Sequence, residues 1–259
     1  MDVDGLLLDI DGVLSVSWDP IDGAIETLGW LREQGIPFRL ITNTTTHPRD
    51  ALANTLREAG FAVDAVEIVT AVVATAGYLR THHSGARVFL LSDGDARADL
   101  HGIDLVGPDE PADVVVIGGA SDDFTYATLN HIFELLNDGA TLIGMHRNMY
   151  WRTADGLQLD AGAYIAALEE ATGTKATICG KPAPAYFEAA LEMLGVQASS
   201  AAMVGDDVVN DVLGAQAIGM AGVLVRTGKF RPADLERHDG EPDHVIDSFA
   251  DLPTLLRTT

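Results

Sequence analysis

The sequence predicts an α/β protein: a doubly wound parallel sheet that carries a second, smaller α/β domain as an insertion. Two patterns predict this fold class. Several short apolar runs show no polar alternation, which is typical of parallel strands buried on both faces. Helical patterns lie between these runs, and several of them end at a glycine, where helices commonly stop. Because strand and helix alternate, we expect an open sheet with helices on both faces.

The elements of the main sheet can be placed in chain order. Helices are expected over residues 21–34, 48–59, 183–194 and 208–218. The runs expected to form its central strands are VDGLLLD, PFRLITN, ATICG, AAMVGDD and AGVLVRTG.

A second set of strand and helix patterns fills the middle of the chain. It contains the apolar runs RVFLLSD and DVVVIGGA and the helical patterns YATLNHIFELLNDG and AGAYIAALEEATG. This is enough material for a small α/β domain of its own. We therefore expect a core formed by residues 1–79 and 175–259, with the inserted domain over 80–174. The insertion would separate the third helix of the main sheet from the strand ATICG.

Composition narrows the classes of function. The chain has 259 residues, of which 47% are hydrophobic, and a formal net charge of -23. This acidic excess argues against a nucleic acid partner, because phosphate backbones attract basic surfaces. No apolar run reaches the roughly 20 residues of a membrane span, and a single cysteine, Cys179, excludes an internal disulfide framework. A cytoplasmic protein with no nucleic acid or membrane partner is expected.

Polar side chains collect where the predicted strands stop, at the edge where open α/β sheets bind ligands. Four carboxylates near a single lysine would repel one another strongly unless a cation lay among them. An all-oxygen site with few protein ligands favours Mg²⁺, which keeps waters and binds a substrate phosphate. The sequence therefore predicts a magnesium site and a small phosphorylated substrate. The residues concerned are Asp9, Asp11, Thr42, Asn43, Lys181, Asp206 and Asp207.

The spacing of Asp9 and Asp11 fits two different catalytic roles, a nucleophile and an acid/base. Asp9, the last residue of its strand, can attack phosphorus and form an aspartyl-phosphate. Asp11, one step into the turn, can protonate the leaving oxygen and later deprotonate the attacking water. Gly12 permits the sharp turn that follows. Thr42 and Lys181 would donate hydrogen bonds to phosphate oxygens.

Four segments, DIDGVL, ITNTT, GKPAPAYF and MVGDDVVNDVLGAQAIGM, resemble in order and spacing the motifs of haloacid dehalogenase (HAD) superfamily phosphatases. The large insertion between the second and third motifs is similar to the α/β cap of the NagD-like subfamily. The stretches DGLQLDAGAYIAALEEATGTKATICGKPAPAYF and VRTGKFRPADLERH resemble the phospholysine phosphohistidine inorganic pyrophosphate phosphatases and their near relatives. The resemblance covers nearly the whole chain. It implies a HAD-like, Rossmann-type core and a cap domain that decides substrate specificity.

The resemblance also implies roles for the motif residues. Asp9 would be the nucleophile and a metal ligand. Asp11 would be the acid/base and give its backbone carbonyl to the metal. Thr42 and Asn43 would bind the phosphoryl group, and Lys181 would hold both the nucleophile and the phosphate.

The fourth motif would supply the remaining acidic groups. The resemblance implies that Asp206 binds Mg²⁺ directly and that Asp207 and Asp211 support it from just outside the ligand shell; capping the following helix is an equally good interpretation of Asp207. This chain has Asp11 where its near relatives carry serine. Aspartate is the pattern of general HAD phosphatases, so the unusual substrates of those relatives are not carried over.

The inserted domain offers further candidates. His146 and Arg147 follow an apolar strand and are expected to bind substrate. Asn148, Tyr150 and Asp160 are also candidates, although each would serve equally well in a turn or hairpin. Caps of this type often meet in dimers, so the resemblance also implies a homodimer through the cap.

One basic cluster stands out in this acidic chain. Arg226, Lys229 and Arg231 lie within six residues of one another. We interpret them first as a solvated loop and second as a contact with a partner or with the cap.

Alternative functions remain open on the sequence. A dehalogenase also uses an aspartate nucleophile but needs neither a metal nor a second aspartate, so Asp11 and Asp206 count against it. A phosphomutase or other phosphotransferase shares the aspartyl-phosphate. A phospho-accepting receiver domain uses similar residue types in a much shorter domain, with the paired acids ahead of a lone acceptor. A phosphate-binding module without catalysis would gain nothing from keeping an acid/base.

Overall fold

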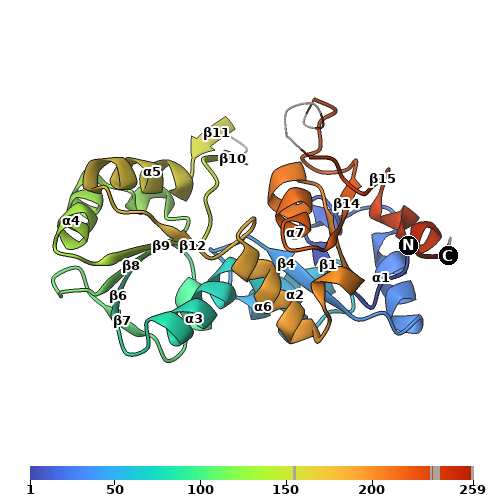
Figure 1. Cartoon of the computed structure of the whole chain (residues 1–259), viewed down its shortest axis with the longest axis horizontal. Coiled ribbons are helices and arrows are strands. Elements are labelled where there is room, and N and C mark those ends of the chain that lie inside the picture. The colour runs from blue at the N-terminus through green and yellow to red at the C-terminus, as the bar shows by residue number, and fades with distance from the viewer. Residues whose placement is uncertain (154–155, 234, 236–239, 258–259) are drawn as a thin grey trace. The chain divides into compact units, whose positions relative to one another are not determined.

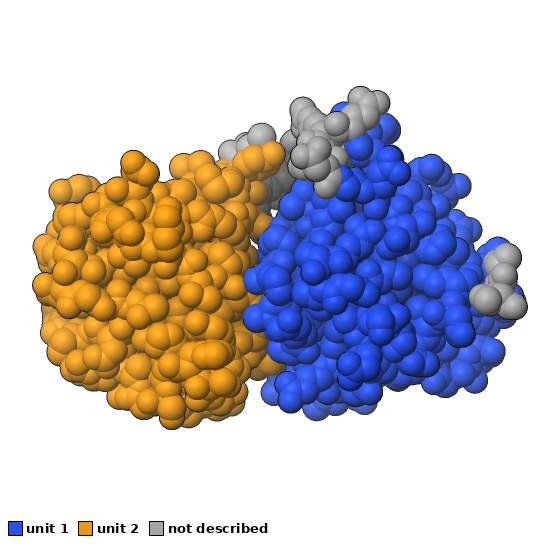
Figure 2. All heavy atoms as spheres, in the orientation of Figure 1, with its two compact units in different colours: residues 1–42, 49–69, 181–259 blue, residues 43–48, 70–180 orange. Residues whose placement is uncertain are grey.

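The computed structural model describes the chain except for residues 154–155, 234, 236–239 and 258–259. The chain folds into two compact units, which Figure 2 colours separately. Unit 1 comprises residues 1–42, 49–69 and 181–259, and unit 2 comprises residues 43–48 and 70–180.

Unit 1 is built on a six-stranded sheet in the order β15-β14-β13-β1-β4-β5. Figure 1 labels β15, β14, β1 and β4 of this sheet. The strand pairs from β15 through to β4 are all parallel. The central strand β1 is buried along its whole length, as its unbroken apolar sequence predicts. The bounds of the strands are β1 Gly5–Asp9, β4 Phe38–Thr42, β5 Ile68–Thr70, β13 Ala201–Gly205, β14 Ala221–Val225 and β15 His244–Ile246, with a small antiparallel hairpin β2 Ser15–Val16 and β3 Asp19–Pro20.

Helices cover the sheet of unit 1. Leu6 and Leu8 of β1 share one core with Leu28 of α1 and Leu56 of α2. Leu7 points to the opposite face because side chains alternate along a strand, and it is also fully buried. Burial of each leucine side chain stabilises the folded state by about 1.5–3 kcal/mol. The leucines on both faces of β1 therefore stabilise its central position in the sheet. The helices are α1 Ala24–Glu33, α2 Arg49–Glu58, α6 Pro184–Leu194, a π-helix Val208–Leu213 that continues into α7 Gly214–Gln216, and α9 Leu252–Arg257, with 3-10 turns at Ala65–Glu67, Ala198–Ser200 and Phe249–Asp251.

Unit 2 has a sheet of its own, with five strands in the order β12-β9-β8-β6-β7 and every pair parallel (Figure 1). The strands are β6 Arg87–Leu91, β7 Asp104–Val106, β8 Val114–Ile117, β9 Thr141–Gly144 and β12 Thr177–Ile178, with an antiparallel hairpin β10 Tyr150–Thr153 and β11 Gly156–Leu159. The helices are α3 Ala71–His82, α4 Tyr126–Asn137 and α5 Ala161–Thr172, with 3-10 turns at Ala96–Asp99 and Ser121–Asp123.

Unit 2 is also doubly wound. Val72 and Leu79 of α3 pack in one core against the face of the sheet that carries Val116. The helices α4 and α5 cover the other face through a second core that includes Ile132 and Ile165. Both units therefore have helices on two faces of a parallel sheet, and the predicted fold class is confirmed.

The strand ATICG belongs to a different sheet from the one expected from the sequence. It forms β12 in the sheet of unit 2, where Thr177 pairs with Ile143 of β9, whereas the sequence pattern placed it in the main sheet. Cys179 packs in the same core as Leu79 of α3, so α3 also belongs to unit 2. The units therefore divide near residues 70 and 180, compared with the expected 80 and 175. Apolar periodicity identifies a strand or helix but not the element that it packs against.

A short segment after β4 also belongs to unit 2. The hydroxyl of Thr45 accepts a hydrogen bond of 3.0 Å from the N–H of Gly119, and the carbonyl of Thr46 accepts one of 3.2 Å from Asp95. These bonds fix residues 43–48 to the ends of the strands of unit 2.

Within the described residues, no helix has both the length and the apolar character needed to cross a bilayer.

Candidate active site

Two buried carboxylates lie at the carboxyl ends of neighbouring strands in unit 1. Asp9 is the last residue of β1 and Asp206 directly follows β13. The two strands pair in parallel with Leu8 opposite Val204, which brings both carboxylates to the same edge of the sheet. Only 4% of Asp9 and 1% of Asp206 is exposed. Burying two like charges is unfavourable unless positive charge compensates them.

Lys181 supplies part of that charge. Its ammonium donates hydrogen bonds of 2.8 Å to Asp9 Oδ1 and 2.6 Å to Asp211 Oδ1. Burial alone would lower the pKa of Lys181, but the carboxylates of Asp211 and Asp9 outweigh that effect and hold the pKa above its usual range. Lys181 is therefore charged at any physiological pH.

Asp211 enters the cluster from the π-helix. It is fully buried, and its Oδ2 accepts a hydrogen bond of 3.1 Å from the N–H of Asp207. Burial raises the pKa of Asp211, while Lys181 opposes that rise. The resemblance implies that Asp211 supports the metal from just outside the ligand shell, and in the structure its carboxylate lies close to those of Asp9 and Asp206.

Among the described residues, only one of the two carboxylate oxygens of Asp206 has a hydrogen-bond donor. Its Oδ2 accepts a hydrogen bond of 2.6 Å from the backbone N–H of Lys229. Its Oδ1 is buried and has no hydrogen-bond partner among the described residues. Burial, together with the charge of Asp9, raises the pKa of Asp206 to about 8. A buried carboxylate oxygen without a donor is the group that a bound cation would satisfy.

The cluster as a whole has the donor chemistry of a divalent metal site. Asp9, Asp206 and Asp211 each offer a carboxylate oxygen, and these oxygens lie within 4.8 Å of one another. Hard oxygen ligands suit Mg²⁺ or Ca²⁺ rather than softer metals. The residues present therefore fit a hard divalent cation.

Asp11 and Gly12 form the turn that follows β1. Asp11 is exposed. Gly12 has a φ of +90°, and a Cβ there would lie 2.1 Å from Asp206 Oδ2. Only glycine permits both this left-handed backbone and this approach to the carboxylate.

Thr42, at the end of β4, is fixed by Tyr186 of α6. The Tyr186 hydroxyl accepts a hydrogen bond of 3.0 Å from the Thr42 N–H. It also lies 2.9 Å from the carbonyl of Thr42 and 2.6 Å from that of Val69, and its single proton can serve one of these at a time. Burial raises the pKa of Tyr186 well above its usual range. Tyr186 therefore acts as a neutral clamp, and nothing in the sequence pattern singled it out.

Two other predicted residues have different surroundings. The Asp207 carboxylate caps the π-helix, because its Oδ1 accepts hydrogen bonds from the N–H groups of Val209 and Asn210 at 3.0 and 2.9 Å. Asn43 belongs to unit 2, where its carboxamide oxygen would lie 2.6 Å from a Cβ at Gly180. Of the polar pair that ends β4, only Thr42 belongs to the same unit as the aspartate cluster.

The candidates in the inserted domain also lie in unit 2. His146 is 3% exposed, and its Nε2 lies 3.8 Å from Asp160 Oδ1. Burial lowers the pKa of His146, while the charge of Asp160 opposes this. Arg147 forms an ion pair with the buried carboxylate of Glu169, so its guanidinium already has a structural partner. Asp160 also caps α5 through the N–H of Ala161 at 2.7 Å.

The remaining candidates of the inserted domain are Asn148 and Tyr150. The backbone N–H of Asn148 donates a hydrogen bond of 3.3 Å to His146 Nδ1. Tyr150 is 62% exposed.

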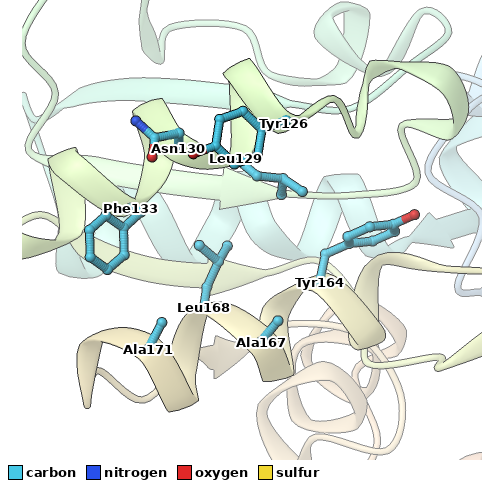
Figure 3. A pocket seen from close by; sticks show the side chains of 8 residues that line it. All are labelled: Tyr126, Leu129, Asn130, Phe133, Tyr164, Ala167, Leu168 and Ala171. Carbon is cyan, nitrogen blue, oxygen red and sulfur yellow. The ribbon is translucent and has the colours of Figure 1, made fainter.

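An apolar groove on unit 2 is a separate feature. It lies between α4 and α5 (Figure 3). The described residues that line it include no carboxylate, lysine, arginine or histidine, so the groove lacks the groups that would bind a phosphate or a metal. Its lining residues are Tyr126, Leu129, Asn130, Phe133, Tyr164, Ala167, Leu168 and Ala171.

Comparison with known families matches both ends of the chain. Residues 6–106 match the family model described as haloacid dehalogenase-like hydrolase, and residues 178–252 match the model described as HAD-hydrolase-like. Among curated proteins, the chain is 39% identical over 244 residues to haloacid dehalogenase-like hydrolase domain-containing protein 2 of Homo sapiens, covering 94% of this chain and 92% of that protein. It is 36% identical over 260 residues to phospholysine phosphohistidine inorganic pyrophosphate phosphatase of Homo sapiens, covering 98% and 94%.

Solved structures agree with these relatives. A p-nitrophenyl phosphatase from Archaeoglobus fulgidus superposes with a TM-score of 0.92 at 30% identity, over 99% of this chain and 100% of that one. NagD from E. coli K-12 superposes with a TM-score of 0.87 at 26% identity, over 97% and 98%. The resemblance drawn from the four motifs is confirmed, and with its buried aspartates and lysine at the ends of the parallel strands, the chain belongs to the NagD-like haloacid dehalogenase-like hydrolases.

Proposed function

We propose that this protein is a Mg²⁺-dependent phosphatase that hydrolyses a small phosphorylated metabolite through an aspartyl-phosphate on Asp9. One observation carries the proposal. Asp9 Oδ1 is held by Lys181 beside Asp206, whose Oδ1 is buried and has no partner among the described residues. A nucleophilic carboxylate next to an unsatisfied metal-ligand oxygen suits phosphoryl transfer through an aspartyl-phosphate. The names of the phosphatase relatives support the same reaction class.

The residues of unit 1 divide the reaction between them. A carboxylate oxygen of Asp9 attacks phosphorus while the bond from phosphorus to the leaving oxygen breaks, and Asp11 gives that oxygen its proton. Water then attacks the phosphorus of the aspartyl-phosphate and loses a proton to Asp11. Inorganic phosphate leaves, and Asp9 regains its carboxylate.

Charge and orientation come from the surrounding groups. Lys181 stabilises negative charge on Asp9 and on the phosphoryl oxygens. The Thr42 side chain, whose backbone is clamped by Tyr186, would donate to a phosphoryl oxygen. Asp9, Asp206 and the backbone carbonyl of Asp11 would hold Mg²⁺, which when bound supplies positive charge to the transferring phosphoryl group.

We assign unit 2 the role of a cap that selects the substrate, with Asn43 binding the phosphoryl group and His146 and Arg147 contacting the substrate. The burial of His146 beside Asp160 supports a recognition role, because a preorganised polar group in a low-dielectric setting discriminates between ligands. The homodimer expected through this unit stays a prediction.

The test is a direct assay of hydrolysis. Purified protein is incubated with Mg²⁺ and p-nitrophenyl phosphate, then with a panel of phosphorylated metabolites that includes pyrophosphate and phosphohistidine. We expect release of inorganic phosphate, with one ¹⁸O incorporated into it when the reaction runs in H₂¹⁸O. Transfer of phosphate to a second metabolite without ¹⁸O incorporation would identify a transferase, and no turnover of any phosphorylated compound would refute the proposal.

A further inference from the structure

Three consecutive residues after β14 close over the aspartate cluster of unit 1. The hydroxyl of Thr227 donates a hydrogen bond to the carbonyl of Gly12. A Cβ on Gly228 would lie 2.5 Å from the Gly12 Cα, so the two backbones are in contact. The N–H of Lys229 donates to Asp206 Oδ2 at 2.6 Å. We call residues 227–229 the TGK segment.

The TGK segment fixes one oxygen of Asp206. A Cβ at either Gly12 or Gly228 would lie 2.1 Å from Asp206 Oδ2, and both glycines have positive φ, +90° and +64°. Two glycines and one N–H therefore surround this oxygen at distances that no other residue type allows. With Oδ2 held in this way, Oδ1 is the oxygen left without a donor. The backbone of Lys229 thus sets the orientation of the carboxylate.

The Lys229 side chain brings a second positive charge to the cluster. Lys229 is exposed as a whole residue, and its backbone N–H lies against Asp206 Oδ2. Burial by itself would lower the pKa of Lys229, but Asp9 and Asp206 outweigh that effect and raise it. In the described part of the chain this ammonium forms no ion pair. Its charge is therefore available to a ligand, whereas that of Lys181 is committed to two carboxylates.

We propose that Lys229 is a further residue of the active site: its backbone N–H positions Asp206, and its ammonium binds the anionic phosphoryl ligand beside the aspartate cluster. The proposal rests on the proposed function of this site. The charges show why a second lysine is useful. With a divalent cation bound, which keeps the three aspartates ionised, the cluster and its two lysines carry about +1, and this charge attracts a phosphate dianion. Without Lys229 the loaded cluster would be neutral.

This assignment predicts two effects of opposite sign. Removing the Lys229 charge leaves the metal-free cluster more negative, so a divalent cation should bind more tightly. The same change makes the loaded cluster less positive, so inorganic phosphate should bind more weakly. A variant that merely disturbed the local structure would weaken both, because it would disorder Asp206.

The experiment compares Lys229→Met and Lys229→Arg with Arg231→Met, which removes an equal charge two residues away. Calorimetry measures Mg²⁺ binding to the metal-free protein and inorganic phosphate binding at saturating Mg²⁺. For Lys229→Met we expect Mg²⁺ affinity to rise and phosphate affinity to fall, each by roughly three- to tenfold. In steady-state assays KM should rise more than kcat falls. Lys229→Arg should restore phosphate binding to within about threefold, and Arg231→Met should change neither affinity by more than about twofold.

Several outcomes would overturn the proposal. It is wrong if Lys229→Met binds phosphate as tightly as the wild type, or if Mg²⁺ and phosphate affinity fall together. It is also wrong if the wild type binds no phosphate at saturating Mg²⁺. Failure of the proposed phosphatase function would give a different result. The wild type would then release no phosphate from any substrate, while the measurements of Mg²⁺ and phosphate binding would still test the role of Lys229.

Discussion

Lys181 donates a hydrogen bond of 2.8 Å to Asp9 across 172 positions of sequence. Both side chains are buried, and the same ammonium reaches Asp211 at 2.6 Å. Removing one member of a buried ion pair leaves an uncompensated charge, at a typical cost of about 3–5 kcal/mol. The contact therefore joins the end of β1, the segment before α6 and the π-helix into one site. Because Lys181 also pairs with Asp211, a substitution of Asp9 still leaves the buried ammonium with one carboxylate partner.

The first prediction concerns Asp9→Asn. The amide keeps the shape of the carboxylate but cannot attack phosphorus, so phosphate release from p-nitrophenyl phosphate should fall by at least about 10³-fold. Circular dichroism and the melting temperature check that the fold survives. Turnover within tenfold of the wild type would show that Asp9 is not the nucleophile.

The second prediction concerns Asp11→Ser. Asp11 is exposed, so the fold and the affinity for Mg²⁺ should be unchanged, since only the backbone carbonyl is assigned to the metal. Turnover of an alkyl phosphate should fall by about 10²–10⁴-fold because the leaving oxygen needs a proton. Turnover of p-nitrophenyl phosphate, whose leaving group needs little protonation, should fall less. An equal loss on both substrates would contradict the role of general acid.

The third prediction is that Mg²⁺ stabilises the fold. Binding to the native state alone should add about 2.7 kcal/mol at a concentration 100 times the dissociation constant. Urea unfolding with Mg²⁺ and with EDTA measures the difference, and EDTA should also abolish phosphatase activity. Asp206→Asn should lose the stabilisation. The matched control is Asp207→Asn, whose side-chain oxygen can still accept the helix-capping bonds, so its response to Mg²⁺ should match that of the wild type. Metal-independent turnover would instead favour dehalogenase-type chemistry.

The fourth prediction concerns Tyr186→Phe. Removing the hydroxyl leaves the buried N–H of Thr42 without its acceptor, which should lower the free energy of unfolding by about 1–3 kcal/mol. The KM for p-nitrophenyl phosphate should also rise, because Thr42 loses its clamp. Tyr126→Phe is the control, since Tyr126 is 86% exposed and its change should stay within about 0.5 kcal/mol. Equal stability of the two variants would rule out the clamp.

The fifth prediction uses the single cysteine. Burial raises the pKa of Cys179 to about 11, so at pH 8 only about 0.1% of the thiol is ionised. Alkylation should be slow in the native protein, should accelerate as pH rises toward the pKa, and should become rapid in urea. Mass spectrometry after timed alkylation measures this, with Cys179→Ala as the blank. Rapid labelling of the native protein at pH 8 would mean that the core around α3 and β12 opens readily.

The strand-end residues of the site could be predicted because parallel strands deliver their last residues to one edge of the sheet. This property predicts that Asp9, Asp206 and Lys181 lie close together, as they do in the structure. It does not identify Tyr186, because an aromatic residue at helical spacing predicts only a core contact. The sequence also indicates only a loop or contact surface for Lys229, since proximity to Asp206 depends on the path of the chain after β14.

The sequence by itself determined the fold class and the hydrolase family, because apolar periodicity and the order of the four motifs are local properties of the chain. Only the tertiary structure decided which sheet receives β12, that Asp211 joins the aspartate cluster, and that the backbone of Lys229 holds Asp206. These relationships join residues brought together by packing and by buried charge pairing. Both depend on the whole fold rather than on any one segment.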